Sequence, residues 1–177
     1  MMANHCDFDM LIVGDKKENV EEFVKYLNAD FDYNEDGVSK TTKADHHFFR
    51  IFETTEGDEE EREDGTYTIQ IGGCCAWSIS SCMMDGGYTY YEQWMERLKE
   101  NPELATTFKG ITLAKACEKL NLTVEIFSAD AGCGFMEHII CDKGEVTLNN
   151  CHTDYREIKN EDGEYEQQGG IEWEYTI

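Results

Sequence analysis

The side chains of this 177-residue chain that most readily bind metals or act as nucleophiles are its eight cysteines and five histidines. The densest group contains Cys133, His138, Cys141, Cys151 and His152. Structural zinc sites usually take their ligands in close pairs such as Cys-x-x-Cys, and the sequence contains no such pair. We therefore predict no metal site and no cofactor, and we expect most thiols to be small buried side chains.

Calcium binding and cysteine catalysis are the next chemistries to weigh. The segment Asp32 to Gly37 matches the opening of an EF-hand loop, but Lys43 stands where the bidentate glutamate is required. A catalytic thiol must ionise, and an acidic environment raises the pKa of a cysteine such as Cys82 or Cys133. The sequence also contains no Walker loop, dinucleotide fingerprint or nucleophile elbow. We predict no catalytic residue.

Charge is the more informative feature, because 15 Lys and Arg stand against 38 Asp and Glu, for a net charge of -23. This balance excludes direct attraction to nucleic acids or to anionic membranes. The segment from Glu53 to Asp64 holds eight acids and one base, and the segment from Asp154 to Glu174 holds eight acids and two bases. Because clustered carboxylates repel one another, we predict that these runs have a binding role.

A row of carboxylates on loops could occupy the basic cleft of a nucleic-acid-binding protein in place of phosphates. Tyr67, Tyr88, Tyr90, Tyr165 and Trp173 could add aromatic anchors beside them. The predicted partner-binding residues are Asp58, Glu59, Glu60, Glu61, Glu63 and Asp64 in one loop, and Glu161, Asp162, Glu164, Glu166, Glu172 and Glu174 in the C-terminal segment.

The elements that must position these acids follow from apolar periodicity. Asp15 is the predicted N-cap of the first helix, and an acidic loop is expected between the second and third strands. Helices are predicted over Lys16–Leu27, Tyr91–Leu98 and Thr112–Leu120, and strands around Phe8–Ile12 and over His46–Thr54, Thr66–Gly73, Leu122–Ser128, Phe135–Asp142, Glu145–Leu148 and, as an extra edge strand, Ile171–Ile177.

This order of elements predicts an α+β fold, a ferredoxin-like or split βαβ antiparallel sheet with helices on one face and a C-terminal strand extension. We expect one such domain over residues 1–150, with 151–177 as an acidic extension packing on or beside it. The chain shows no 18-residue apolar stretch and no signal peptide, so we expect a cytoplasmic protein.

Short segments carry a resemblance to a known family. They are Asn4 to Phe8 leading into a strand that ends at Gly14, Trp77 after a glycine-rich strand end, and Ser128 to Phe135. Over residues 4–148 the chain resembles the ferredoxin-like family of plasmid and phage proteins typified by YubB. The resemblance implies a fold and a mobile-element setting, and it implies no reaction.

The leading functional hypothesis is a non-enzymatic phage or mobile-element protein that inhibits a basic nucleic-acid-binding protein of the host. An anti-CRISPR protein that blocks an effector nuclease is the concrete form, and neither nucleic acid nor membrane is expected as a direct partner. One alternative is a self-associating structural module whose sheet face carries Trp77 and Tyr67, with acidity serving solubility. A third is a metal-binding or redox protein that uses Cys and His.

Overall fold

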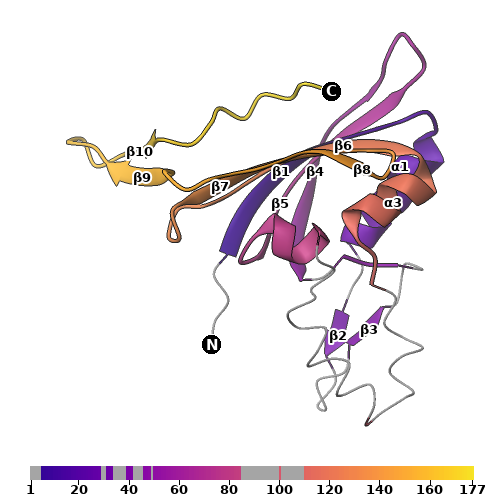
Figure 1. The fold of residues 1–177 in the computed structure, drawn as a ribbon, viewed down its shortest axis with the longest axis horizontal. Coiled ribbons are helices and arrows are strands. Elements are labelled where there is room, and N and C mark those ends of the chain that lie inside the picture. The colour runs from indigo at the N-terminus through magenta and orange to yellow at the C-terminus, as the bar shows by residue number, and fades with distance from the viewer. Residues whose placement is uncertain are drawn as a thin grey trace.

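The computed structural model describes residues 5–28, 31–33, 39–41, 46–48, 50–84, 100 and 110–177. Its main feature is a six-stranded antiparallel sheet in the order β4-β5-β1-β6-β7-β8 (Figure 1). The strands are β1 (His5–Gly14), β4 (Ile51–Glu61), β5 (Tyr67–Ala76), β6 (Leu122–Asp130), β7 (Phe135–Asp142) and β8 (Glu145–His152). The α+β class predicted from the sequence is confirmed.

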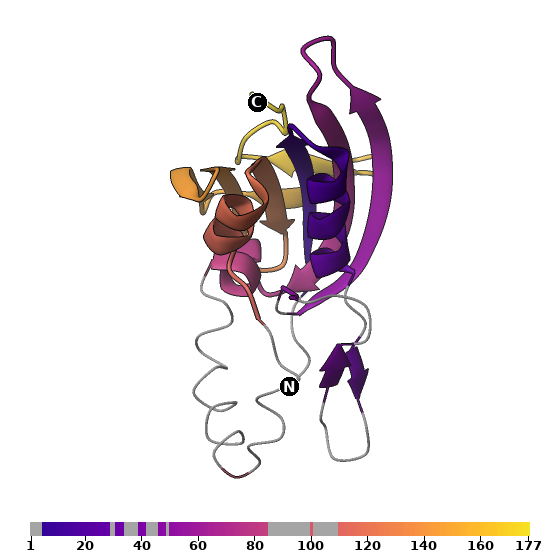
Figure 2. The ribbon, with the colours of Figure 1, turned by 90° about the vertical axis from the view of Figure 1, so that its right-hand side faces the viewer.

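Two helices, α1 (Lys17–Leu27) and α3 (Leu113–Leu120), cover one face of the sheet (Figure 2). The predicted alternation of β1 is confirmed, because Phe8, Met10 and Ile12 are buried toward the helices. Met10 pairs with Ile71 on one side and Ile126 on the other, so neighbouring strands supply rows of apolar side chains to the core.

A hydrogen bond joins the start of α1 to the end of α3. The N-cap of α1 is Lys16, not the predicted Asp15, and no side chain caps this end of the helix. The Asp15 carboxylate instead accepts a 3.0 Å hydrogen bond from the side chain of Asn121. Asn121 is the C-cap of α3 in the left-handed conformation, which asparagine tolerates better than most residues.

A short π-helical turn, η1 (Ser80–Met84), follows β5 and is capped by the sheet. Glu137 on β7 is buried, and its carboxylate accepts hydrogen bonds from the amide of Ile79 at 2.9 Å and the hydroxyl of Ser128 at 2.7 Å. A buried carboxylate is therefore satisfied by donors and ties the turn to the core.

The predicted loop around the first acidic run is wrong. We expected a strand over His46–Thr54 followed by an acidic loop, whereas β4 begins at Ile51 and continues to Glu61. In the part of the chain that the structure describes, His47 belongs to an isolated bridge with Gly110 and not to β4. The acidic residues have no apolar alternation of their own, but β5 provides the hydrogen-bonding ladder that holds them in a strand.

The C-terminal segment forms a hairpin and then an extended tail. Strands β9 (Arg156–Lys159) and β10 (Tyr165–Gln168) pair with each other outside the main sheet. The edge strand predicted over Ile171–Ile177 is absent, because these described residues are extended without a ladder partner. They run across the sheet face opposite the helices (Figure 2).

Two further predictions concern segments that are described only in part or not at all. A small hairpin pairs β2 (Phe31–Tyr33) with β3 (Ser39–Thr41), within the stretch compared with a calcium loop, and the intervening residues lie outside the described part. The helix predicted over Tyr91–Leu98 also lies outside it.

Candidate partner-binding surface

The first acidic run lies on an exposed edge of the sheet. Because β4 is the last strand of the sheet, only β5 pairs with it among the described strands. Every residue from Glu56 to Glu61 is exposed, and Glu63 and Asp64 in the following turn are exposed as well. We call the six residues Asp58, Glu59, Glu60, Glu61, Glu63 and Asp64 the β4 acidic edge.

The pairing of β4 with β5 distributes these acids over two faces. Glu59 and Glu61 pair with Ile69 and Tyr67 and so share the face that α1 covers, whereas Glu60 pairs with Thr68 on the opposite face. A register shift lies between Glu56 and Glu59. A single strand therefore presents carboxylates on both of its faces.

The turn after β4 is held in place by its own hydrogen bonds. The amide of Arg62 donates to the main-chain oxygen of Thr66 at 2.8 Å, and Gly65 has a positive φ of 84°. The Asp64 carboxylate accepts from the hydroxyl of Thr66 at 2.7 Å and from its amide at 2.9 Å. These bonds lower the pKa of Asp64, which keeps its carboxylate ionised.

The second predicted group of acids is separate from the β4 acidic edge. Glu161, Asp162, Glu164 and Glu166 lie on the β9–β10 hairpin, which projects from the far end of the sheet (Figure 1). The turn of this hairpin is ordered by Asn160, whose side-chain oxygen accepts from the amide of Glu164 at 2.8 Å. Glu172 and Glu174 are exposed on the tail. The four hairpin acids therefore form a second acidic surface, whereas the tail runs back toward the turn after β4, where Arg62 donates to the main-chain oxygen of Ile177 at 3.2 Å.

The aromatic side chains proposed as anchors differ in their placement. Tyr165 and Trp173 are 70% and 40% exposed. Tyr67 is buried on the helix face, and its hydroxyl donates a short hydrogen bond to Glu59. Burial and this hydrogen bond raise the pKa of Tyr67. Tyr88 and Tyr90 lie outside the described residues.

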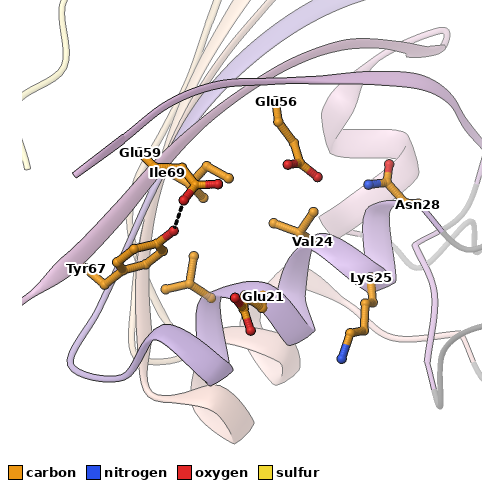
Figure 3. A pocket seen from close by; sticks show the side chains of 9 residues that line it. Glu21, Val24, Lys25, Asn28, Glu56, Glu59, Tyr67 and Ile69 are labelled. Atoms are coloured by element: carbon orange, nitrogen blue, oxygen red, sulfur yellow. Dashed lines mark hydrogen bonds between the residues drawn. The ribbon is translucent and has the colours of Figure 1, made fainter. Parts of the chain in front are cut away.

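A pocket of about 360 Å³ lies between α1 and the β4–β5 hairpin (Figure 3). Its lining residues are Val20, Glu21, Val24, Lys25, Asn28, Glu56, Glu59, Tyr67 and Ile69. The valines, Ile69 and Tyr67 are buried, and the carboxylates come from two different elements. The sequence alone does not predict this pocket, because the pocket depends on how α1 packs against the β4–β5 hairpin.

A polar cluster on the opposite sheet face binds the C-terminal tail. Glu125 is fully buried, and its carboxylate accepts from Nε2 of His138 at 2.6 Å and from the amides of Thr176 at 2.6 Å and Ile177 at 3.1 Å. Tyr175 donates to Asp9 close by. The tail residues therefore complete the hydrogen bonding of a buried carboxylate that His138 satisfies only in part.

An aromatic stack accompanies these hydrogen bonds. The ring of Phe127 stacks on His138 with centroids 4.2 Å apart, and the ring of Trp173 stacks on Phe127 at 6.0 Å. The indole N–H of Trp173 lies 3.3 Å from the sulfur of Met136. Apolar and polar contacts together hold the tail against the sheet.

The cysteine and histidine cluster noted in the sequence is divided between faces. Cys141 is buried on the helix side of β7 next to Cys117, whereas His138 bonds to Glu125 on the other side. Cys133 and Cys151 are exposed thiols. No group of three or more metal-ligating side chains occurs in the described part of the chain.

The fold and surface thus define a small α+β protein with an acidic edge strand and a covered second sheet face. No family model, curated protein or solved structure matches the chain. Among the described helices, none combines the length and the apolar character needed to cross a membrane.

Proposed function

We propose that this protein is a non-enzymatic inhibitor that binds a basic nucleic-acid-binding protein through the β4 acidic edge. Its concrete form is a phage or mobile-element protein that counters a host defence nuclease, such as an anti-CRISPR protein. The partner would present a cationic cleft to this edge. The protein itself would bind neither nucleic acid nor a membrane, because its net charge is -23.

We further infer a ferredoxin-like arrangement. The strands β4, β5, β1 and β6 are adjacent and antiparallel, and the connections that contain α1 and α3 lead from β1 to β4 and from β5 to β6. Two such split crossovers are typical of a ferredoxin-like sheet. Strands β7 and β8 extend the sheet beyond β6. The mobile-element setting is proposed separately, from the sequence resemblance of residues 4–148.

The charge spacing of β4 is the observation that carries the functional proposal. Asp58, Glu59, Glu60 and Glu61 are consecutive and exposed on a strand. A strand rises about 3.3 Å per residue, so these side chains supply one charge per about 3.3 Å of strand. One strand of a DNA duplex carries one phosphate per about 3.4 Å of helix axis. Because successive carboxylates lie on opposite faces of β4, a basic cleft that encloses both faces of this edge strand would meet a similar linear charge density, whereas contact with one face would meet about half of it.

The energetics of binding follow from this similarity. A cationic cleft holds condensed anions and the acidic edge holds cations, and their association releases both. The attraction would accelerate encounter and would weaken as salt screens it. The position of β4 at the sheet edge leaves its carboxylates accessible to a groove.

The proposal is tested by capturing partners from a host lysate that contains nuclease-based defence systems, using the purified chain as bait. We expect retention of a basic nucleic-acid-binding protein, its release by salt, and its displacement by duplex DNA or RNA. Displacement is the critical observation, because it shows that nucleic acid and this chain compete for the same cleft. Retained proteins that nucleic acid fails to displace would count against mimicry.

One observation favours self-association as a second candidate. Strand β8 forms the edge of the sheet opposite β4. Its residues from Val146 to Cys151 carry no charge. An uncharged edge can pair with a second copy, whereas the acids on β4 would repel one. A salt-resistant homodimer in size-exclusion chromatography with mass measurement, without any basic partner in the capture, would favour this candidate.

A further inference from the structure

The geometry points to the pocket between α1 and the β4–β5 hairpin as the binding site for an arginine side chain of the basic partner. This inference rests on the proposed function and identifies how the same surface would recognise its partner. The pocket's floor, its rim of carboxylates and a lysine already present at one end each contribute to the assignment.

The floor suits the aliphatic part of a long side chain. Val20, Val24 and Ile69 are 0%, 8% and 4% exposed, and they form the apolar base of the pocket. Its volume of about 360 Å³ lies within the range of about 300–1,000 Å³ common for small-ligand sites. An arginine side chain can bury its methylene groups on such a floor while its charged end remains at the rim.

The rim is negatively charged. Glu21 from α1 and Glu56 and Glu59 from β4 line the pocket (Figure 3). Lys25 is the lysine among the lining residues, but its ammonium group points away and forms a 3.2 Å ion pair with Glu22. Because Lys17 pairs with Glu21 and Glu59, Glu56 is the rim carboxylate that would attract a further cation.

One end of the pocket already binds a cation of the chain itself. The Lys17 ammonium group lies 3.7 Å from the Glu59 carboxylate, 3.8 Å from the Glu21 carboxylate and 4.8 Å from the centre of the Tyr67 ring. This arrangement combines ion pairing with a cation–π contact. The same wall of the pocket is thus able to hold a positive charge beside apolar surface.

The Glu56 end is where an external cation would bind. Among the described residues, Glu56 forms no ion pair, and Figure 3 shows its carboxylate directed into the pocket. A guanidinium group is planar, weakly hydrated and able to donate two parallel hydrogen bonds to one carboxylate. An ammonium group is more strongly hydrated and lacks this fork, so arginine fits better than lysine.

The test uses N-acetyl-arginine-N-methylamide as the probe and the corresponding citrulline derivative, which is neutral and nearly isosteric, as the control ligand. Binding to the full chain is followed by NMR through the methyl groups of Val24 and Ile69. We expect saturable shifts with the arginine probe, and about tenfold weaker binding of the citrulline derivative.

The matched variants are Glu56→Gln and Glu53→Gln. Both glutamates are exposed on β4, but Glu53 pairs with Cys74 and lies on the opposite face from the pocket. We expect Glu56→Gln to weaken the arginine probe about tenfold, and Glu53→Gln to leave its affinity within about twofold. Absence of shifts at Val24 and Ile69, or equal effects of the two variants, would overturn the inference.

The probe experiment tests the arginine site independently of the inhibitor proposal, because it requires no host protein. Probe binding without capture of a basic partner would retain the arginine site and reject the inhibitor. Capture that nucleic acid displaces, with no probe binding, would reject the arginine site alone.

Discussion

The buried imidazole of His47 makes the stability of the protein dependent on pH. His47 is fully buried, and burial, together with the neighbouring His46, lowers the pKa of its imidazole from 6.5 to about 4. The folded protein therefore keeps His47 neutral, whereas the unfolded chain takes up a proton below about pH 6.5. The contribution of the neutral, buried His47 to the stability of the folded protein is therefore complete above about pH 6.5 and is lost as the pH falls toward 4.

We predict that proton uptake by His47 in the unfolded chain lowers the free energy of unfolding by about 2 kcal/mol when the pH falls from about 7.5 to about 5. Urea unfolding gives the change in unfolding free energy between the two pH values for the wild type and for His47→Leu. The change in the wild type minus the change in His47→Leu is the contribution of His47. The exposed His5, replaced by Gln, serves as the control. An identical pH dependence in His47→Leu and the wild type would refute the assignment.

The eight cysteines divide into exposed and protected thiols. Cys133 and Cys151 are exposed, whereas five others are buried. Hydrogen bonding with Cys6 and Cys82, together with burial, raises the pKa of Cys75. Burial also raises the pKa of the partly exposed Cys74. Low thiolate content and burial both slow alkylation.

We therefore expect Cys133 to react first with a thiol reagent in the native state, and Cys151 and Cys74, whose pKa values are raised by burial, to react more slowly. The five buried thiols should react only after unfolding. Mass spectrometry of partially alkylated protein would identify the modified positions. Rapid native modification of Cys6 or Cys117 would contradict the described core.

Among the contacts that hold the C-terminal tail, the buried carboxylate of Glu125 accepts the hydrogen bonds from the tail amides of Thr176 and Ile177. Replacing Glu125 with Gln would place an amide N–H₂ group among the donors of His138, Thr176 and Ile177. We predict that Glu125→Gln lowers the free energy of unfolding by about 2 kcal/mol, because at least one buried hydrogen-bond donor is left unsatisfied. The indole N–H resonance of Trp173 should shift toward its solvent-exposed position as the tail is released.

The matched control for this prediction is Glu118→Gln on the exposed face of α3. This variant should change neither stability nor the Trp173 resonance by a measurable amount. A Glu125→Gln variant with the wild-type resonance and unfolding midpoint would show that the tail is held by its aromatic stack alone.

Apolar periodicity was sufficient to predict the elements that face the core. β1, β5, β6, β7, α1 and α3 were all located, because each buries a regular set of apolar side chains. β4 was predicted only in part, since its acidic half is a strand only through pairing with β5. Ile171, Trp173 and Tyr175 alternate as in a strand, but alternation cannot distinguish a sheet edge from a segment lying across a sheet face.

The candidate site was predictable in composition but not in arrangement. The sequence showed that Asp58 to Asp64 form a dense acidic run, and it could not show that the hairpin acids lie at the far end of the sheet. Tyr67 was predicted as an aromatic anchor, whereas it is buried on the helix face, and its hydrogen bond to Glu59 requires the register of β4 on β5. Long-range register is not encoded in local periodicity.

At the scale of the whole molecule, the two acidic surfaces provide an internal comparison. The β4 acidic edge and the β9–β10 hairpin can each lose four carboxylates, one aspartate and three glutamates, with the same change in net charge. The edge set is Asp58→Asn, Glu60→Gln, Glu61→Gln and Glu63→Gln, and the hairpin set is Asp162→Asn, Glu161→Gln, Glu164→Gln and Glu166→Gln. Glu59 is retained in both, because it binds Tyr67 and Lys17.

The most direct measurement is the affinity of the captured partner for the wild type and for these two variants over a series of salt concentrations. We predict that the edge set lowers affinity at least about a hundredfold and flattens the salt dependence, whereas the hairpin set changes affinity by less than about threefold. Equal losses in the two variants would show that net charge alone drives binding. Unchanged affinity in the edge variant would contradict the central claim that β4 stands in for a nucleic-acid strand.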